Sequence, residues 1–329
     1  MITVLAGGVG AARFLAGLVG VVDHGEITAV VNTGDDTVLH GLEVCPDLDT
    51  VTYTLAGAID PERGWGLRGE TWRALEALGR FTPHRPAHST AGGTWFGLGD
   101  ADLATHLYRT ARRAEGATLT EVTAEITRAF DLGLTIVPMT DDRVSTRVTV
   151  VDPGTTAPVE VGFQEYFVGR RHGVPVTRVR FAGCVIARPS PTVLSALGGA
   201  DVVVIAPSNP LVSIGPIRSI PAYEQLLQQR REQVVAISPI VGGAALKGPA
   251  DRMLTELGHE ASVVGVARLY APVCATLVID RVDEHLADAV RALGLRCVVT
   301  DTIMSSPDAA SALARVTLVA GGGKGPWAA

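Results

Sequence analysis

The chain has 329 residues, 47% of them hydrophobic, and a formal net charge of −6 at pH 7. This length and apolar content suffice for a large α/β fold with a buried core. The 28 basic residues are spread along the chain, so its field repels nucleic acid and we expect no nucleic-acid partner. The longest apolar stretch, residues 14–22, is far shorter than the roughly 20 residues that span a bilayer, and we expect no membrane association.

The cysteines indicate a reducing compartment. There are four of them, and none belongs to a C-x-x-C pair of the kind found in structural zinc sites: Cys45, Cys184, Cys274 and Cys297. Free thiols are typical of the cytoplasm. The chain also opens directly on a strand pattern instead of the basic segment of a signal peptide. We therefore expect a cytoplasmic protein.

The most informative stretch is the first one, where a strand pattern over residues 2–6 is followed by GGVG and then by an amphipathic helix pattern. Glycines in such a turn let bare backbone N–H groups approach an anion, and the positive end of the helix faces the same point. We predict that phosphate is bound by Gly7, Gly8, Gly10 and Arg13. A plain tight turn is the alternative, because GGVG lacks the Lys and Ser or Thr of a P-loop and does not complete G-x-G-x-x-G.

Short apolar runs rich in Val and Ile alternate with helical patterns over most of the chain, as in a doubly wound sheet. The predicted strands cover residues 2–6, 27–32, 202–206, 234–238, 276–279 and 297–299. The predicted helices cover residues 11–19, 217–231, 250–257, 284–293 and 308–319. The sequence therefore predicts an α/β fold with a doubly wound, mostly parallel, Rossmann-like sheet.

The middle of the chain has a different pattern. Residues 50–80 and 101–130 carry Leu, Ala and Val at helical spacing, whereas residues 147–161 and 177–181 resemble short strands. This composition predicts an inserted, mainly helical subdomain with a small β element.

The predicted division follows from these patterns. A nucleotide-binding core of residues 1–50 and 176–320 is interrupted by the inserted subdomain of residues 51–175. Within the insert, residues 81–99 are dense in Pro, His and Gly and are predicted to form a mobile connection or lid. Residues 321–329 are predicted to be a tail, with Lys324 folding back over a phosphate as the alternative.

Acidic residues follow the second predicted strand and open the next helix. VVNTGDD places Asp35 and Asp36 at the carboxyl end of that strand, where open α/β sheets bind ligands. PDLDT places Asp47 and Asp49 at a helix start, and an N-cap or a solvated turn is the simpler interpretation of such acids. Grouped carboxylates also suit Mg²⁺, which takes one or two of them together with substrate phosphate. We predict Mg²⁺ as the cofactor, bound by Asp47 and Asp49.

Two further loops follow predicted strands at the same sheet edge. APSNPLVSIGPI supplies neutral donors, and we predict nucleotide or phosphate contacts from Ser208, Asn209, Pro210 and Ser213. SPIVGGAALKGP ends the next strand in the same way and carries Lys247. A turn without a ligand is the alternative for a run of Pro, Ser and Asn.

Two histidines stand out by their positions. His106 follows Asp102 by four residues on a predicted helix face, and an ordinary surface pair is the favoured interpretation. His40 lies between the two acidic motifs. The sequence contains no G-x-S-x-G and no H-E-x-x-H, so hydrolase and metalloprotease functions lack support.

Nine motifs occur in one order along nearly the whole chain: AGGVGAARFLAGL, VVNTGDD, PDLDTVTYTLAG, GLGDADLATH, PMTDDRVST, GFQEYFVGR, APSNPLVSIGPI, SPIVGGAALKGPA and DTIMSS. With them the chain resembles the 2-phospho-lactate transferase family of coenzyme F-420 biosynthesis, in its actinobacterial form. The resemblance implies an enzyme that joins a GMP-activated three-carbon phosphoacid, phosphoenolpyruvyl or phospholactyl, to the terminal hydroxyl of the deazaflavin Fo and releases GMP. It also implies a homodimer.

The resemblance further implies roles for particular residues. Asp49, the second acid of PDLDT, is expected to be catalytic and to contact Fo, either binding the metal or accepting the hydroxyl proton. Asp36 and His40 are expected beside the deazaflavin. The family's GDRD-type motif has a basic residue near the deazaflavin where this chain has Ala101, and Arg85 or Arg68 is expected to compensate.

A regulatory protein that binds a nucleotide-sugar or dinucleotide is the alternative function, because a related family shares the Gly-rich strand-turn-helix. Those relatives carry an extended glycine run and an acid-Gly-Gly-Ser stretch where this chain has GGVG and TGDDTVLHG, which favours the transferase. A NAD-dependent dehydrogenase ranks third, since the second strand ends in Asn32 instead of an acid that binds ribose.

Overall fold

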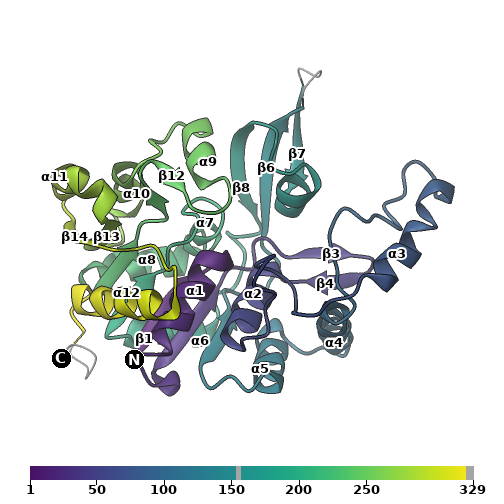
Figure 1. The fold of residues 1–329 in the computed structure, drawn as a ribbon, viewed down its shortest axis with the longest axis horizontal. Coiled ribbons are helices and arrows are strands. Elements are labelled where there is room, and N and C mark those ends of the chain that lie inside the picture. The colour runs from purple at the N-terminus through teal and green to yellow at the C-terminus, as the bar shows by residue number, and fades with distance from the viewer. Residues whose placement is uncertain (153–156, 324–329) are drawn as a thin grey trace.

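The computed structural model describes residues 1–152 and 157–323, and its centre is a seven-stranded sheet (Figure 1). In spatial order the strands are β14 (Arg296–Thr300), β13 (Thr276–Asp280), β10 (Val234–Ile237), β9 (Val202–Ile205), β1 (Ile2–Ala6), β2 (Ile27–Val31) and β5 (Thr135–Pro138). Every neighbouring pair is parallel. This confirms the predicted α/β fold with a doubly wound parallel sheet.

Helices cover both faces of the sheet. One face carries α1 (Gly8–Leu18), α2 (Pro46–Leu55) and α12 (Pro307–Ala320). The other carries α6 (Pro191–Gly199), α7 (Ile214–Arg218), α8 (Pro221–Gln229), α10 (Val263–Tyr270) and α11 (Ala287–Arg291). In β1, Val4 belongs to the first core and Leu5 to the second. Because successive strand side chains point to opposite faces, a strand covered on both sides is apolar throughout.

Some boundaries differ from the prediction. The edge strand β5 was not predicted, since it is four residues long and includes Pro138, which has no N–H to donate to a ladder. It pairs with β2, so residues 135–138 lie in the main sheet although they were assigned to the insert. The predicted helix 217–231 is divided between α7 and α8, and α8 begins at Pro221. The predicted helix 284–293 begins as the 3₁₀ segment η5 (Arg281–Leu286).

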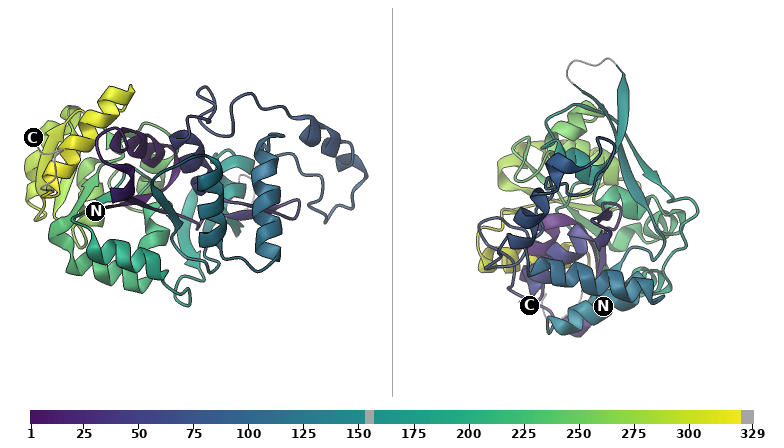
Figure 2. Two further views of the ribbon diagram at one scale, coloured as in Figure 1. Left: turned by 90° about the horizontal axis from the view of Figure 1, so that it is seen from below. Right: turned by 90° about the vertical axis from the view of Figure 1, so that its right-hand side faces the viewer.

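Between β2 and β5 the chain forms a hairpin and helices that extend to one side of the sheet (Figure 2, left). Besides α2, they are β3 (Thr37–Leu39), β4 (Leu42–Val44), α3 (Arg73–Gly79), α4 (Asp102–Ala114) and α5 (Leu119–Ala129). The prediction of helix over residues 50–80 is wrong for residues 56–72, which are not helical. Four glycines there, including Gly57 and Gly64, have positive φ, a conformation that interrupts helices.

A small antiparallel sheet stands beside the main one and confirms the predicted β element (Figure 1). It comprises β6 (Ser145–Val151), β7 (Pro158–Gly162) and β8 (Val176–Ala182), with β6 in the centre. The remaining elements are β11 (Ile240–Val241), β12 (Ala244–Ala245) and α9 (Ala250–Glu256).

The predicted lid, residues 81–99, contains only the 3₁₀ turn η2 (Thr82–His84). Lys324 and the rest of the predicted tail beyond residue 323 lie outside the described residues. In the described part of the chain, no helix is both long enough and apolar enough to cross a membrane.

Candidate active site

The loops after β1 and β9 meet at the point where the sheet's strand order reverses. From β1 the chain continues to β2 on one side, whereas β9 and β10 extend on the other. The Gly7 N–H donates to Ser208 Oγ at 3.3 Å, and the Ser208 hydroxyl donates to the Gly7 carbonyl at 2.8 Å. Ligands of open α/β sheets bind outside the strand ends at such a switch point.

Close packing explains two of the glycines in the first loop. A Cβ on Gly7 would lie 2.7 Å from Ser213 Cβ, and a Cβ on Gly10 would lie 2.2 Å from the Pro207 carbonyl oxygen. Only glycine lets these two loops approach so closely. The N-terminus of α1, which begins at Gly8, is therefore held against the second loop.

A cavity of about 630 Å³ lies over these loops. The predicted site residues in its lining are Gly7, Gly8, Gly10, Arg13, Asp47, Ser208, Asn209 and Ser213. Its lining does not include the other four: Asp36, His40, Asp49 and Pro210. Lys247, from the third predicted loop, also lines the cavity. The three loops that were predicted to lie at one edge of the sheet therefore line one cavity.

Two buried acids face this cavity. Asp47 accepts a hydrogen bond from Asn32 Nδ2 at 2.8 Å, and Asp35 lies beside it with an Oδ1 that has no hydrogen-bond partner. Burial and the Asp47 charge raise the pKa of Asp35 well above its usual value. Burial also raises the pKa of Asp47 to about 6. Two adjacent buried carboxylates provide oxygen ligands of the kind that Mg²⁺ takes.

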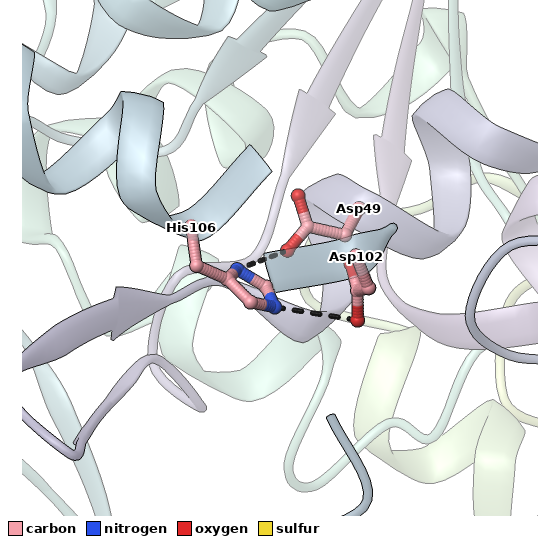
Figure 3. A group of neighbouring side chains, drawn as sticks. All are labelled: Asp49, Asp102 and His106. Carbon is pink, nitrogen blue, oxygen red and sulfur yellow. Dashed lines mark ion pairs between the residues drawn. The ribbon is translucent and has the colours of Figure 1, made fainter. Parts of the chain in front are cut away.

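Asp49 faces away from the cavity lining and contacts α4. Its Oδ2 accepts a hydrogen bond from Arg109 Nη1 at 3.2 Å, and its Oδ1 is paired with Arg109 Nη2. His106 Nδ1 lies 3.7 Å from Asp49 Oδ2, and His106 Nε2 lies 3.3 Å from Asp102 Oδ2 (Figure 3). Tyr53 donates its hydroxyl to Asp102 at 2.7 Å. This buried network joins α2 to α4.

The predicted surface location of His106 is wrong, because its exposed fraction is only 1%. Asp49, Asp102 and His106 are close enough to suggest a metal site. However, the two carboxylates face different nitrogens of the ring, whereas a single ion takes one nitrogen from each histidine. Arg109 already neutralises Asp49. The geometry fits a buried network of ion pairs better than a metal centre.

The remaining predicted site residues lie in three different surroundings. His40 is exposed at the turn between β3 and β4, with φ of 53°. Asp36 lies by the Cys45 thiol, and burial raises the pKa of Asp36. Pro210 is in a turn closed by Asn209, whose Oδ1 accepts the Leu211 N–H at 2.9 Å. None of the three lines the cavity.

Neither arginine that was expected to compensate at the deazaflavin lines the cavity. Arg68 donates to the Gly57 carbonyl and Arg85 to the Ala91 carbonyl. Arg63 lines the cavity instead.

Sequence reasoning missed the aromatic part of the cavity lining and its polar neighbours. The missed residues are Arg63, Trp65, Phe96, Phe163, Gln164 and Phe167. A signal was present, because aromatic residues are only 5% of the chain and yet Trp and Phe occur in the glycine-rich strings GWG and TWFG. Binding residues are often carried by loops that a rigid scaffold positions.

Comparisons with known proteins show the family of this chain. A family model described as 2-phospho-L-lactate transferase CofD matches residues 2–315. The chain belongs to the CofD family. It is 42% identical over 318 residues to a phosphoenolpyruvate transferase of Streptomyces griseus, covering 96% of this chain and 97% of the relative. It is 39% identical over 326 residues to a phosphoenolpyruvate transferase of Mycolicibacterium smegmatis, covering 96% and 97%.

A solved structure shares the fold of this CofD-family chain. A protein of the UPF0052 family from Bacillus halodurans is 16% identical, has a TM-score of 0.59, and is matched over 96% of this chain and 98% of its own. At that identity the likeness concerns the fold alone. Family membership makes the chain a transferase of coenzyme F-420 biosynthesis.

Proposed function

We propose that this CofD-family transferase moves a phosphoenolpyruvyl group, or its 2-phospholactyl analogue, from a GMP-diphosphate donor to the terminal hydroxyl of Fo. The hydroxyl oxygen attacks the phosphorus that bears the three-carbon acid, the bond from that phosphorus to GMP breaks, and the hydroxyl proton is lost. The products are dehydro coenzyme F-420-0, or F-420-0, and GMP. This is transfer of a substituted phosphate group. The names of the actinobacterial relatives support the phosphoenolpyruvyl form.

The observation that carries this proposal is a single cavity with two chemically different sets of lining residues. One set comprises the start of α1 and the hydroxyls of Ser208 and Ser213; the other comprises four aromatic side chains. Helix N-termini bind phosphate through free N–H groups. Arg13 and Lys247 also line the cavity and add positive charge in an otherwise acidic chain. Phosphoryl transfer depends mainly on such positioning and charge neutralisation.

Magnesium is proposed as the cofactor, and the residues of the cavity fit it. Asp47 and Asp35 would hold the ion, because both are buried at the cavity and Asp35 Oδ1 has no hydrogen-bond partner. When bound, the ion would neutralise part of the diphosphate charge. Asp49 is less suited to be the second ligand, since its carboxylate is already paired with Arg109. We propose that Asp49 acts on catalysis by positioning α2, which carries Asp47.

The direct test is turnover by the purified protein with Fo, the GMP-activated donor and Mg²⁺. We expect GMP release that requires Fo and that stops when a chelator removes the metal. Mass spectrometry of the product distinguishes the unsaturated from the saturated side group by two hydrogens. Binding of a nucleotide-sugar without any GMP release would contradict the proposal and favour a regulatory protein.

We also infer that the chain acts as a homodimer in the cytoplasm. Val185 and Ile186 are neighbours after β8 and are 80% and 85% exposed, which is unusual for apolar side chains unless another surface covers them. All four cysteines are free thiols, which suits a reducing compartment.

A further inference from the structure

Three basic side chains line the cavity, and one of them is already paired within the protein. The three are Arg13, Arg63 and Lys247. Arg63 Nη2 lies 2.8 Å from Asp60 Oδ2 and donates to the Leu67 carbonyl at 3.1 Å. Arg13 and Lys247, by contrast, form no ion pair among the described residues. Two positive charges of the cavity are therefore available to an anionic ligand.

The contacts of Arg63 indicate that this arginine supports its neighbours. Its guanidinium carbon lies 5.6 Å from the Trp65 ring centroid and 5.4 Å from the Trp72 ring centroid. Contacts between a cation and an aromatic ring at such distances are favourable. Together with the Asp60 pair, they account for the charge of Arg63 without a ligand.

Arg13 belongs to the part of the cavity that suits phosphate. It lies in α1, whose N-terminus begins at Gly8 and also lines the cavity. Free N–H groups and the positive end of the dipole at a helix N-terminus attract phosphate, and an arginine on the same helix adds its charge to theirs. We therefore assign the charge of Arg13 to the diphosphate of the donor.

Lys247 belongs to another part of the chain, the third loop (residues 238–249), which runs from β10 to α9. Its Nζ lies 3.0 Å from the position of a Cβ on Gly64, in the segment between α2 and α4. A Cβ on the next residue, Gly248, would lie 3.9 Å from the Phe167 ring. Lys247 therefore lies where the third loop meets the segments that carry the aromatic lining.

The third loop is anchored at both sides of Lys247. The Gly242 N–H donates to Asp283 Oδ2 at 2.9 Å, and Asp283 is buried. Beyond the loop, Arg252 of α9 donates to the Tyr166 hydroxyl at 2.7 Å. A cation whose backbone is held in place before binding loses less entropy when it pairs with a ligand.

The donor of the proposed reaction carries a carboxylate in addition to its phosphates. The N-terminus of α1, Arg13 and the proposed Mg²⁺ account for the charge of the two phosphates. The carboxylate belongs to the group that is transferred, so it approaches the acceptor and needs a cation of its own. An ammonium group has three N–H donors and a compact charge, which suits a carboxylate.

We propose that Lys247 binds the carboxylate of the three-carbon acid and so determines that the transferred group is an acid. The inference rests on the proposed function and assigns a specificity-determining residue within it. A donor without the carboxylate would leave the ammonium group unpaired inside the occupied cavity. Sites built to pair with a polar group discriminate strongly against analogues that lack it.

The test compares the donor with GDP, which carries the same guanylate and diphosphate but no carboxylate. Steady-state GMP release with Fo and Mg²⁺ gives kcat/KM for the donor, and competition in the same assay gives Ki for GDP. Lys247→Met removes the charge and keeps an unbranched side chain. We expect it to lower kcat/KM for the donor roughly tenfold, because a hydrogen bond to a charged group is lost. Ki for GDP should stay within about twofold of wild type, because GDP has no group that pairs with Lys247.

Three further variants are the controls. Lys247→Arg keeps the charge and should recover most of the lost kcat/KM. Arg13→Met should raise the donor KM and Ki for GDP together, because both ligands carry the diphosphate. Arg291→Met is the matched surface control, since Arg291 in α11 is half-exposed and does not line the cavity. Both constants should match wild type in that control.

Two results would overturn the inference. One is an unchanged kcat/KM for the donor in Lys247→Met. The other is a rise in Ki for GDP as large as the loss with the donor, which would assign Lys247 to the diphosphate. If Lys247→Met aggregates, Lys247→Gln gives the same comparison with a polar side chain at this exposed position. Failure of the proposed function itself is distinguishable, because wild-type protein would then release no GMP from the donor.

Discussion

Asp47 and Asp49 are two residues apart in α2 and have different environments. At 3.6 residues per turn they project about 200° apart around the helix axis. Asp47 consequently lines the cavity, whereas Asp49 meets Arg109 of α4. Spacing along the chain predicts one metal site for the pair, because spacing alone does not show the direction of a side chain around the helix.

Arg109 is the residue on which the buried network depends most. It is 1% exposed and is the cation that pairs with Asp49. Replacing it by methionine leaves a buried carboxylate without its counter-charge, and we expect Arg109→Met to lower the free energy of unfolding by about 3–5 kcal/mol. Urea denaturation measures this.

Arg113 in the same helix provides the control. Its pair with Glu43 is 3.4 Å long and partly exposed on both sides. Arg113→Met should therefore cost less than about 1 kcal/mol. An equal loss of unfolding free energy in the two variants would contradict the prediction that Arg109 stabilises the fold more than Arg113.

Metal binding is tested at Asp47. Anything that binds only the folded state raises its melting temperature, so Mg²⁺ should raise that of wild type. Asp47→Asn should abolish this shift, because it removes one of the two proposed ligands. Asp308→Asn, at the exposed start of α12, should keep it. An undiminished shift in Asp47→Asn would show that the ion binds elsewhere.

An ion pair between α4 and α5 makes a pH-dependent contribution to the free energy of unfolding. Arg112 in α4 holds Glu125 of α5 through two hydrogen bonds of 3.0 and 2.9 Å. Hydrogen bonding by Arg112, and then by Tyr108, lowers the pKa of Glu125 to about 2 from its ordinary value of 4.5. The ion pair therefore contributes fully to the free energy of unfolding above pH 4.5, and this contribution is lost as the pH falls toward 2.

We expect Glu125→Gln to lower the melting temperature at pH 7, with a difference from wild type that narrows below pH 4.5. Differential scanning calorimetry across this range measures the effect. Glu76→Gln is the control, because Glu76 is exposed in α3 and makes no ion pair among the described residues. A difference that is independent of pH would exclude the ion pair as its cause.

Elements were predictable where the pattern was strong. The β1, β9 and β10 runs are continuous and apolar because both faces of the sheet are covered. The edge strand β5 and the break over residues 56–72 were missed. The strand β5 includes Pro138, and residues 56–72 include several glycines with positive φ. A single proline or glycine changes the backbone conformation but leaves the hydrophobic pattern around it unchanged.

At the scale of the whole molecule, the homodimer proposal is tested at Val185 and Ile186. We expect light scattering to give twice the chain mass of 34.3 kDa for wild type. Ile186→Asp should shift the protein toward the monomer, because it would bury a charge in an apolar interface. Val282→Asp is the control, at a 61% exposed valine elsewhere on the surface. A monomeric wild type would contradict the proposal.

The sequence by itself determined the parallel sheet and the three loops at its edge, because strand periodicity and glycine-rich turns are properties of neighbouring residues. The tertiary structure decided which acids share the cavity, and it placed Asp35 beside Asp47. It also decided that Trp65 and Phe167 line one cavity, although about a hundred residues separate them in the chain. Such proximity depends on how the insert packs on the sheet, and no local pattern encodes it.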